Sequence, residues 1–463
     1  MRGVQWESSL AVALLCGSAS AVAFNAKDEA SVKNAASVAA NNTIALYNGR
    51  NTSDIPGKWA GAWYPGGVMF DTLINYWYFT GDSTYNKVVS DGMYWQAGND
   101  SDFFPSNYSQ SLGNSDQLVW GFAAMSAAEM NFTRNSSRPS WTTMAENVFN
   151  TQVARWDTHN CKGGMRTGIW PYQEDYQLKD ALSNGGLFEL AARLAHSTSN
   201  KTYSEWAEKI WTWSGTTSLL DVDAGSVSDS TTCDSNCSKR STSLEWSWNY
   251  GVFLSGAAYM YNMTNGDKKW KTGIDNLLNA TTLLFFPTDG FGLADGKIMI
   301  EMACEPSNTC DQSQVVLRST FIQSLVQTAL KAPYTLSKIV PLLQGSASAA
   351  AITCTGGKSN LCDGPWYMEK NGVNGTTEDQ MAALSIFTSN LIAFQGSGSA
   401  ASSPGANSTN SSSTTASPTQ TASSTGASGA ATTTAGNNEA GVLVSSTRAM
   451  LLAIFLAAFA ALL

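Results

Sequence analysis

The chain has 463 residues, of which 43% are hydrophobic and 14% charged, so its composition indicates a large folded protein rather than a disordered one. Acidic residues outnumber basic ones by 36 to 27, a formal net charge of −9, which argues against nucleic acid as a partner. The chain has only two histidines, which argues against a multi-histidine metal site and against most Ser-His-Asp triads. We expect no metal and no cofactor. The 16 Trp and 15 Tyr residues, together with the carboxylates, suit carbohydrate chemistry.

Residues 1–23 have the pattern of a secretory signal peptide. Arg2 precedes an apolar run from Leu10 to Cys16, and Ala21-Val22-Ala23 follows the small-x-small rule for cleavage. A buried first helix is the alternative, but the short apolar run and the small residues at its end favour the signal. We therefore expect the folded part to start at residue 24 and to mature in the secretory pathway.

Helices are predicted throughout the middle of the chain, because apolar residues recur at helical spacing and alternating strand patterns are scarce. They are expected at 28–48, 66–79, 83–97, 117–132, 141–157, 181–196, 203–218, 250–263, 267–282, 314–331, 335–349 and 378–394. Short and long connections alternate, which predicts six helical hairpins closed into an all-α (α/α)6 barrel, one domain over residues 24–395. A helical solenoid is the alternative, although no repeat of fixed period is visible. The longer loops would meet at one end of the barrel and form a substrate cleft.

The C-terminal part reads as a stalk and a processing signal. Residues 396–438 are almost wholly small and hydroxylated, which predicts a disordered, O-glycosylated stalk. In residues 439–463, the apolar run Met450–Leu463 is too short to span a bilayer comfortably and suits the tail of a GPI signal, with attachment at Asn438. A retained membrane anchor is the alternative. We expect the mature protein on the outer face of the plasma membrane.

Sequons and cysteines agree with a secretory route. N-glycosylation is predicted at thirteen Asn-x-Ser/Thr sites: Asn41, Asn51, Asn99, Asn107, Asn131, Asn135, Asn200, Asn236, Asn262, Asn279, Asn374, Asn407 and Asn410. Two disulfides are predicted between cysteines close in sequence, Cys304 with Cys310 and Cys354 with Cys362. Cys161, Cys233 and Cys237 remain, so one thiol is free or its pairing is not local.

One helix start carries a candidate catalytic carboxylate. Ser111-Leu-Gly-Asn-Ser-Asp-Gln117 leads from a loop into a predicted helix, and Asp116 lies at that junction. A carboxylate in this position usually caps the helix by accepting backbone N–H bonds. Taken alone, the motif favours this structural role.

Seven motifs in order nevertheless resemble those of fungal glycoside hydrolase family 76, the mannan endo-1,6-α-mannosidases of the GPI-anchored cell-wall type. They are Leu73–Asp82, Leu112–Gln117, Trp156-Asp157 with Cys161–Arg166, Ser183–Gly185, Trp246–Gly251, Glu301–Cys304, and Cys354–Gly357 with Trp366. The match runs from about residue 30 to residue 394. It implies an (α/α)6 barrel, in agreement with the helix pattern.

The resemblance also exposes a departure from the family. Relatives carry Gly-Asn-Asp-Asp-Gln, in which the first aspartate is read as nucleophile and the second as general acid/base. Here Asp116 keeps the acid/base position, whereas Ser115 stands at the nucleophile position. A serine hydroxyl carries no charge near neutral pH and cannot stabilise an oxocarbenium-like centre as a carboxylate does. Asp71, Asp175 and Asp180 are considered as replacement carboxylates.

A second departure lies in Trp63-Tyr-Pro-Gly66, where relatives commonly have an acidic residue near Pro65. Substrate contacts are predicted for six residues: Asn114, Gln117, Arg166, Trp246, Asn249 and Tyr250. For each of them a structural role is the alternative: helix capping, a surface salt bridge or core packing. His159 and His196 are expected to be structural.

By resemblance, the substrate is α-1,6-mannan or the mannose of a GPI glycan, and wall glucan is a possible acceptor. The protein would then act as a cell-wall mannosidase or transglycosidase that joins GPI-linked mannoproteins to glucan, at the membrane or in the wall. The alternative, favoured by Ser115, is a non-catalytic mannan-binding or structural wall protein on the same fold.

Overall fold

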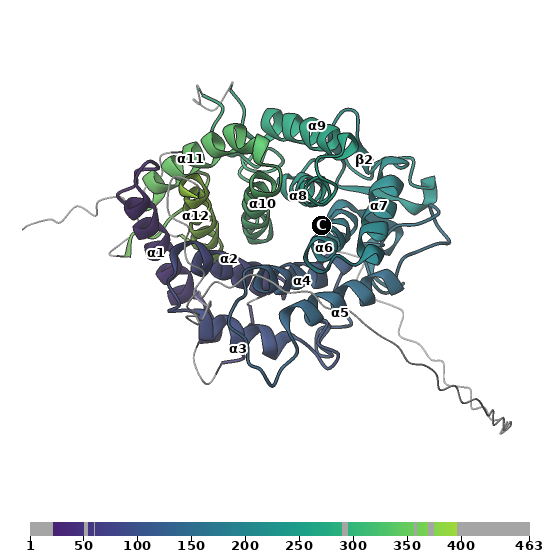
Figure 1. Ribbon diagram of the computed structural model, residues 1–463, viewed down its shortest axis with the longest axis horizontal. Helices are drawn as coiled ribbons and strands as arrows, with labels where there is room; N and C mark the ends of the chain where they lie inside the picture. Colours follow the sequence, from purple (N-terminus) through teal and green to yellow (C-terminus); the bar gives the residue numbers. More distant parts are fainter. Residues whose placement is uncertain are drawn as a thin grey trace, which may run out of the picture. The chain divides into compact units, whose positions relative to one another are not determined.

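The computed structural model describes residues 22–50, 54–59, 61–288, 295–355, 359–368 and 375–395. In these residues, twelve α-helices form an inner and an outer ring (Figure 1). The inner helices are α2 (Pro65–Thr80), α4 (Asn114–Glu129), α6 (Ala181–Thr198), α8 (Ser247–Met263), α10 (Gln312–Lys331) and α12 (Thr377–Ser389). The outer helices are α1 (Glu29–Leu46), α3 (Asn86–Gln96), α5 (Trp141–Ala154), α7 (Lys201–Gly215), α9 (Lys268–Phe285) and α11 (Leu336–Thr353).

Each inner helix packs against the next one along the chain, and α12 packs against α2, so the inner ring closes. Inner and outer helices differ in how apolar residues are distributed around them. The inner helices are covered on almost all sides, so they are apolar on almost all sides, as in Leu118–Ala127 of α4. The outer helices α7 and α9 instead bury one apolar face and leave a charged face in water. Local caps set several helix starts, with Asp28, Asp180 and Asp267 each accepting a backbone N–H bond.

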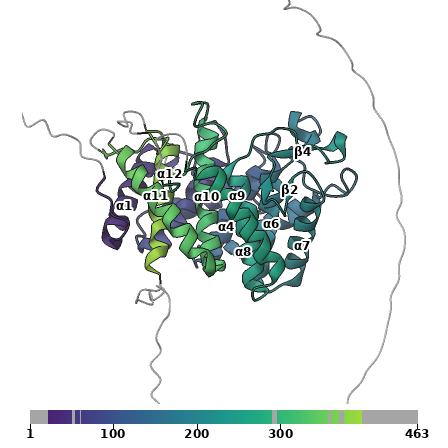
Figure 2. The same ribbon diagram turned by 90° about the horizontal axis from the view of Figure 1, so that it is seen from above.

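The alternating chain direction brings the starts of the inner helices and the long loops to the same end. Across this end, the hydroxyl of Tyr64 before α2 donates to the carbonyl of Ser313 in α10 at 3.2 Å. Two small antiparallel sheets lie in the loops: β1 (Leu178–Asp180) pairs with β4 (Ser230–Thr232), and β2 (Leu220–Asp221) pairs with β3 (Ser226–Val227). Figure 2 shows β4 beyond the ends of α6 and α7. Short 3-10 turns complete the fold: Asn48–Arg50, Glu174–Gln177, Cys233–Ser235, Pro333–Thr335 and Asn390–Phe394.

Helix boundaries depart from the sequence-based expectation at the functional end. Helix α4 begins at Asn114 and not at residue 117, and α8 begins at Ser247 and not at residue 250. The predicted last helix, 378–394, is an α-helix only to Ser389 and continues as a 3-10 turn. The reason at α4 is that the carboxylate of Asp116 accepts the backbone N–H of the N-cap residue, Gly113, at 2.8 Å. The sequence does not reveal this start because glycine has no capping side chain.

Three disulfides lie in the loop layer. The predicted pairs Cys304–Cys310 and Cys354–Cys362 are confirmed. A third bond, Cys161–Cys237, joins the loop before α6 to the loop before α8, and it leaves Cys233 as a buried free thiol among the described residues. The pairing that the sequence left open is therefore a non-local one.

Several expectations lie outside the described residues: residues 1–21 of the signal-like segment, the stalk, the GPI signal with Asn438, and the sequons at Asn51, Asn374, Asn407 and Asn410. The described sequons all have exposed asparagines: Asn41, Asn99, Asn107, Asn131, Asn135, Asn200, Asn236, Asn262 and Asn279. Among the described helices, none combines the length and the apolar character that a membrane crossing requires.

A buried ionic cluster joins α4 and α6. The guanidinium of Arg193 contacts Glu129 at 2.9 Å, Glu189 at 3.3 Å and the hydroxyl of Ser126 at 2.8 Å. The positive charge of Arg193 also acts on the carboxyl group of Asp71 in α2. Burial raises the pKa of Glu189 to about 8 and that of Asp71 to about 6, although Arg193 opposes both shifts. One buried cation thus faces three carboxyl groups and cannot compensate three negative charges. At least one of these carboxyl groups therefore stays protonated near neutral pH.

This cluster makes a prediction for stability. A carboxyl group whose pKa is higher in the folded than in the unfolded state holds its proton only when folded, so the free energy of unfolding falls as pH rises between the two values. For Glu189 that interval runs from the ordinary glutamate pKa of 4.5 to about 8. We expect denaturant titrations at pH 8 to give a lower free energy of unfolding than at pH 6, with a slope of up to about 1.4 kcal/mol per pH unit for one proton.

The control is Glu189→Gln, which removes the titrating group and retains an oxygen that Arg193 can contact. This variant should flatten the dependence between about pH 6 and 8, where Glu189 titrates and Asp71 no longer does. Below pH 6 the dependence should become shallower but persist, because Asp71 still contributes there. An equally steep dependence in both proteins would show that Glu189 is ionised in the folded state and that another group is responsible.

Candidate active site

The first turn of α4 positions Asp116 where the long loops meet. Asp116 is the third residue of the helix, and its Oδ2 accepts the backbone N–H of Gly113 at 2.8 Å. Burial raises the pKa of Asp116 to about 6; the Gly113 hydrogen bond opposes this shift, and the charges of Asp180 and Asp175 add to it. A carboxyl group with this pKa can hold and release a proton near neutral pH, as general acid/base catalysis requires.

Asp175 approaches this turn because a glycine leaves room for it. The backbone of Gly168 pairs with that of Gly113, and the amide N–H of Asn114 donates to the carbonyl of Thr167 at 3.0 Å. A Cβ added to Gly168 would lie 2.6 Å from Oδ1 of Asp175. Burial raises the pKa of Asp175, and the neighbouring charge of Asp180 raises it further. The loop before α6 therefore delivers a second carboxylate to the neighbourhood of Asp116.

Two more carboxylates complete this acidic group, which we define as Asp116, Asp175, Asp180 and Asp229. Asp180 is the N-cap of α6, where its Oδ2 accepts the Ser183 N–H at 2.9 Å, and burial raises its pKa. Burial and the charge of Asp180 raise the pKa of Asp229 to about 6, against a hydrogen bond from Asn249. Mutual repulsion means that the four side chains titrate as a coupled set.

Ser115 is the second residue of α4 and is half-buried beside Asp116. Its hydroxyl makes no hydrogen bond with any described residue. The position that carries an aspartate in the family pattern thus bears no negative charge. Asp71, considered as a replacement from the sequence, belongs to the Arg193 cluster and does not perturb the pKa of Asp116.

Gln117 points away from this turn. It is fully buried, its Nε2 donates to the carbonyl of Asp102 at 2.7 Å, and its Oε1 accepts from Gln152 at 3.0 Å and from Arg155 at 2.8 Å. These contacts hold the α4–α5 hairpin together. The predicted substrate contact of Gln117 would require these hydrogen bonds to Asp102, Gln152 and Arg155 to break.

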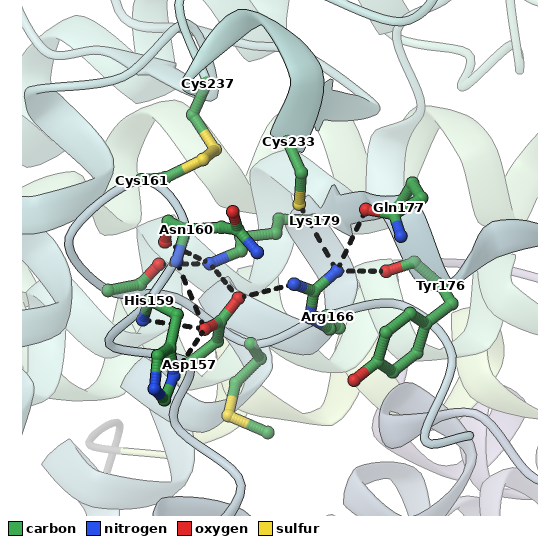
Figure 3. A network of polar contacts seen from close by, with 12 residues as sticks. Asp157, His159, Asn160, Cys161, Arg166, Tyr176, Gln177, Lys179, Cys233 and Cys237 are labelled. Carbon is green, nitrogen blue, oxygen red and sulfur yellow. Dashed lines mark hydrogen bonds and ion pairs between the residues drawn. A yellow bond between two sulfur atoms is a disulfide. The ribbon is translucent and has the colours of Figure 1, made fainter. Parts of the chain in front are cut away.

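Arg166 and Asn114 lie at the edge of the site. The guanidinium of Arg166 pairs with Asp157 at 2.9 Å, donates to the carbonyl of Tyr176 at 2.7 Å and lies 3.5 Å from the sulfur of Cys233 (Figure 3). The buried ammonium of Lys179 contacts the same Asp157 at 3.2 Å. This network ties the loop before α6 to the loop before α8.

A cavity of about 480 Å³ opens next to this network, and Asn114, Arg155, Arg166 and Tyr176 are among the residues that line it. The amide of Asn114 donates to the carbonyl of Arg166 at 2.8 Å, so both residues have structural partners. Because they also face a cavity beside the first turn of α4, a substrate contact for either one stays a prediction.

The aromatic residues at the start of α8 are mostly buried. Trp246 stacks on Trp248 with ring centroids 4.8 Å apart, and the Tyr250 hydroxyl donates to Glu245 at 2.9 Å. The Asn249 amide lies 3.3 Å from Asp229 and so reaches the acidic group. Of the three predicted substrate contacts here, Trp246, Asn249 and Tyr250, Asn249 therefore has the most direct link to the candidate catalytic residues.

Two residues at this end received no role from sequence reasoning. Glu301 accepts hydrogen bonds from the Ser247 N–H at 3.2 Å and its hydroxyl at 2.5 Å, and burial raises its pKa to about 7 despite these bonds. Asp229 lies in a Ser/Thr-rich loop without a motif. Glu301 stands in a motif of the family pattern, which was an available signal, whereas only the folded loop reveals Asp229.

Comparison with known proteins decides the family. The model of glycosyl hydrolase family 76 matches residues 31–402. The chain belongs to this family. The expected resemblance is thereby confirmed, and family 76 membership makes the protein a glycoside hydrolase by class.

Curated family 76 relatives are similar over most of their length. A putative mannan endo-1,6-alpha-mannosidase of Schizosaccharomyces pombe is 38% identical over 332 residues, which cover 70% of this chain and 72% of the relative. Mannan endo-1,6-alpha-mannosidase DCW1 of Saccharomyces cerevisiae is 38% identical over 362 residues, covering 77% and 78%.

Solved family 76 structures confirm the (α/α)6-type fold. Dfg5 from Chaetomium thermophilum, in complex with glucosamine, superposes with a TM-score of 0.75 at 32% identity, covering 80% of this chain and 92% of that one. An alpha-1,6-mannanase of a Salegentibacter species matches with a TM-score of 0.62 at 15% identity, covering 78% and 99%. That structure is an inactive variant with two adjacent aspartates changed to alanine, in complex with alpha-1,6-mannotetrose.

Among the described residues, no group of three or more His, Cys, Asp or Glu side chains has an arrangement that could hold a metal ion.

Proposed function

We propose that this protein cleaves or transfers α-1,6-linked mannose, with Asp116 as general acid/base. The names of the yeast relatives support this substrate class. The observation that carries the proposal is the placement of Asp116 in the first turn of α4, with one oxygen held by Gly113 and a pKa near 6. Its other oxygen makes no hydrogen bond with the described residues and can face a glycosidic oxygen.

The reaction must proceed without a carboxylate at residue 115. Asp116 donates its proton to the glycosidic oxygen as the bond from that oxygen to the anomeric carbon breaks. A water or an acceptor hydroxyl forms the new bond to the anomeric carbon, and a second carboxylate takes its proton. Asp175 is our candidate for this base, because Gly168 lets it approach the first turn of α4. Such a single displacement inverts the anomeric configuration.

The turnover of α-1,6-mannotetraose by the purified glycoprotein tests this proposal. We expect slow release of shorter mannosides, with inverted configuration when products are followed by NMR immediately after cleavage. Adding a concentrated sugar acceptor separates transfer from hydrolysis, since only transfer gives longer products. Fast turnover with retained configuration would contradict the base role of Asp175 and require a nucleophilic carboxylate.

Ser115 favours one other function, a mannan-binding wall protein without turnover. The cavity beside the first turn of α4, lined by Asn114, Arg166 and Tyr176, would still provide a sugar-binding surface. Calorimetry with the same mannotetraose distinguishes the two functions, because a binder gives a saturable signal and no products over days. Binding without products would replace the enzymatic proposal.

We propose further that the mature protein acts at the outer face of the plasma membrane or in the cell wall. There it would use the mannose of GPI-linked glycoproteins as donor and wall glucan as acceptor. The signal-like residues 1–23, the GPI-like residues 439–463 with Asn438, and the many sequons support this location.

This location makes a direct prediction. Phosphatidylinositol-specific phospholipase should release the protein from washed membranes into the soluble fraction, because a GPI anchor is the expected link to the bilayer. Immunoblotting of both fractions measures the release, and a transmembrane marker serves as control. Continued membrane association, with the peptide 450–463 detected by mass spectrometry in the mature protein, would establish a retained anchor instead.

A further inference from the structure

A hollow on the outer wall of the barrel contains an unusually exposed tryptophan. Its volume is about 730 Å³, and its residues come from α3, from the loop that follows α3 and from the segment before α5. Trp95 of α3 lines it with 63% of its surface exposed, and Pro105 lines it as well. A large, solvent-exposed aromatic ring beside a hollow indicates a surface to which a ligand binds.

The floor of the hollow is rigid. The ring of Tyr94 stacks on Trp141 with centroids 4.4 Å apart and an interplanar angle of 20°. On the same ring lies the guanidinium of Arg138, 5.2 Å from the centroid, and its Nη2 donates to the Tyr94 carbonyl at 2.9 Å. Tyr94, the residue before Trp95 in α3, is therefore held by Trp141 and by Arg138. A ligand at Trp95 would thus bind to a preformed surface.

Three glycosylation sequons converge on this hollow. Asn99, Asn107 and Asn135 all line it, and all three are exposed. None of their side-chain NH₂ groups donates a hydrogen bond to a described residue, which leaves each one free to carry a sugar. At Asn135, the Oδ1 accepts from the backbone N–H of Ser137 at 3.0 Å and from its hydroxyl at 2.7 Å, so the amide nitrogen points away from those bonds.

We propose that the chain's own N-linked glycans occupy this hollow, and that a core N-acetylglucosamine of the Asn99 glycan stacks on the indole of Trp95. A pyranose ring has one face of C–H groups, which can cover an aromatic face while its hydroxyls stay in water. Asn99 follows Trp95 by four residues, just after α3 ends. The covalent tether keeps the sugar at a high effective concentration, so even a weak contact is well populated.

This inference concerns the outer wall and does not depend on the proposed activity. The occupant of the hollow is assigned to the chain itself because three glycan attachment sites line the same hollow as Trp95. Free mannan is the alternative occupant, and the experiment separates it from the chain's own glycan.

The test is oxidative labelling of Trp95 in the purified full-length glycoprotein, read by mass spectrometry together with glycan occupancy at the three sites. Because a stacked sugar covers one of the two ring faces, Trp95 should be labelled about twofold or more slowly with glycans than after enzymatic deglycosylation. Tyr172, which is 64% exposed, provides the internal reference. Asn99→Gln should reproduce the faster labelling, whereas the matched control Asn41→Gln on α1 should not.

Thermal unfolding provides a second readout that needs no labelling. Trp95→Ala and Asn99→Gln should each lower the melting temperature, and the double variant should lose no more than the larger single loss, because both remove one contact. Absence of glycan at all three sites, or equal Trp95 labelling with and without glycans, would overturn the proposal. So would slower labelling of Trp95 in the glycosylated protein on addition of mannan oligosaccharide, since the ring would then be open to external ligands.

Discussion

Replacing Ser115 with aspartate should raise the turnover of α-1,6-mannan oligosaccharides about tenfold or more, a lowering of the barrier by roughly 1.4 kcal/mol. The substitution places a carboxylate at the second position of α4, directly before Asp116 in the chain. Negative charge is favourable in the first turn of a helix, so the fold should tolerate it. Initial rates on mannotetraose for the two purified proteins measure the effect.

The control is Ser115→Asn, which has nearly the size of aspartate but no charge. It should not gain activity, because the gain depends on stabilising positive charge at the anomeric carbon. The product configuration gives a second control: Ser115→Asp should shift it from inversion towards retention, since a carboxylate there can form a glycosyl intermediate. A wild-type enzyme that is already fast and gains nothing from Ser115→Asp would contradict our reading of this position.

The same pair of proteins identifies the base. In the wild-type background, Asp175→Asn should remove most of the residual activity, because no other group is proposed to take the proton of the attacking water. In the Ser115→Asp background the same change should matter much less. Equal losses in both backgrounds would mean that Asp175 has a role common to both mechanisms, such as holding the loop at Gly168.

Replacing Asp116 with asparagine should lower the turnover by about a thousandfold, because an amide cannot protonate the departing oxygen. Asparagine can still accept the Gly113 N–H, so the start of α4 should be preserved. The same group predicts the pH dependence of the wild-type enzyme. A general acid works when protonated, so activity should fall as pH rises through about 6, the pKa of Asp116.

Rates over a series of pH values and calorimetry with mannotetraose provide the measurements. The asparagine variant should bind the oligosaccharide with an affinity close to wild type, which separates a chemical defect from a folding defect. If the asparagine variant turns over mannotetraose as fast as wild type, proton transfer occurs elsewhere and Asp116 only accepts the Gly113 N–H at the start of α4.

Much of the architecture could be predicted from local patterns. The apolar spacing within each helix and the alternation of short and long connections were enough to predict the hairpins, because both depend on neighbouring residues. The disulfides Cys304–Cys310 and Cys354–Cys362 were accessible for the same reason. The importance of Asp116 came from its family motif and not from local physics, which favoured a simple cap.

Contacts between distant segments could not be predicted in this way. Asp175 and Asp180 raise the pKa of Asp116, and Asp180 raises that of Asp229, because separate loops meet over one end of the ring. No periodic pattern in the sequence predicts this meeting. Gln117 looked like a site residue from its motif, but the helical turn directs it into the α4–α5 hairpin.

The sequence by itself determined the helices, their pairing into hairpins and the family, since each rests on residues close together in the chain or on motifs in order. Only the tertiary structure decided which carboxylates share a site, that Cys161 pairs with Cys237 across 76 residues, and that Asn99, Asn107 and Asn135 line the same hollow as Trp95. The physical reason is ring closure: packing α12 against α2 brings loops from the whole chain to one end, and side-chain burial there sets each pKa.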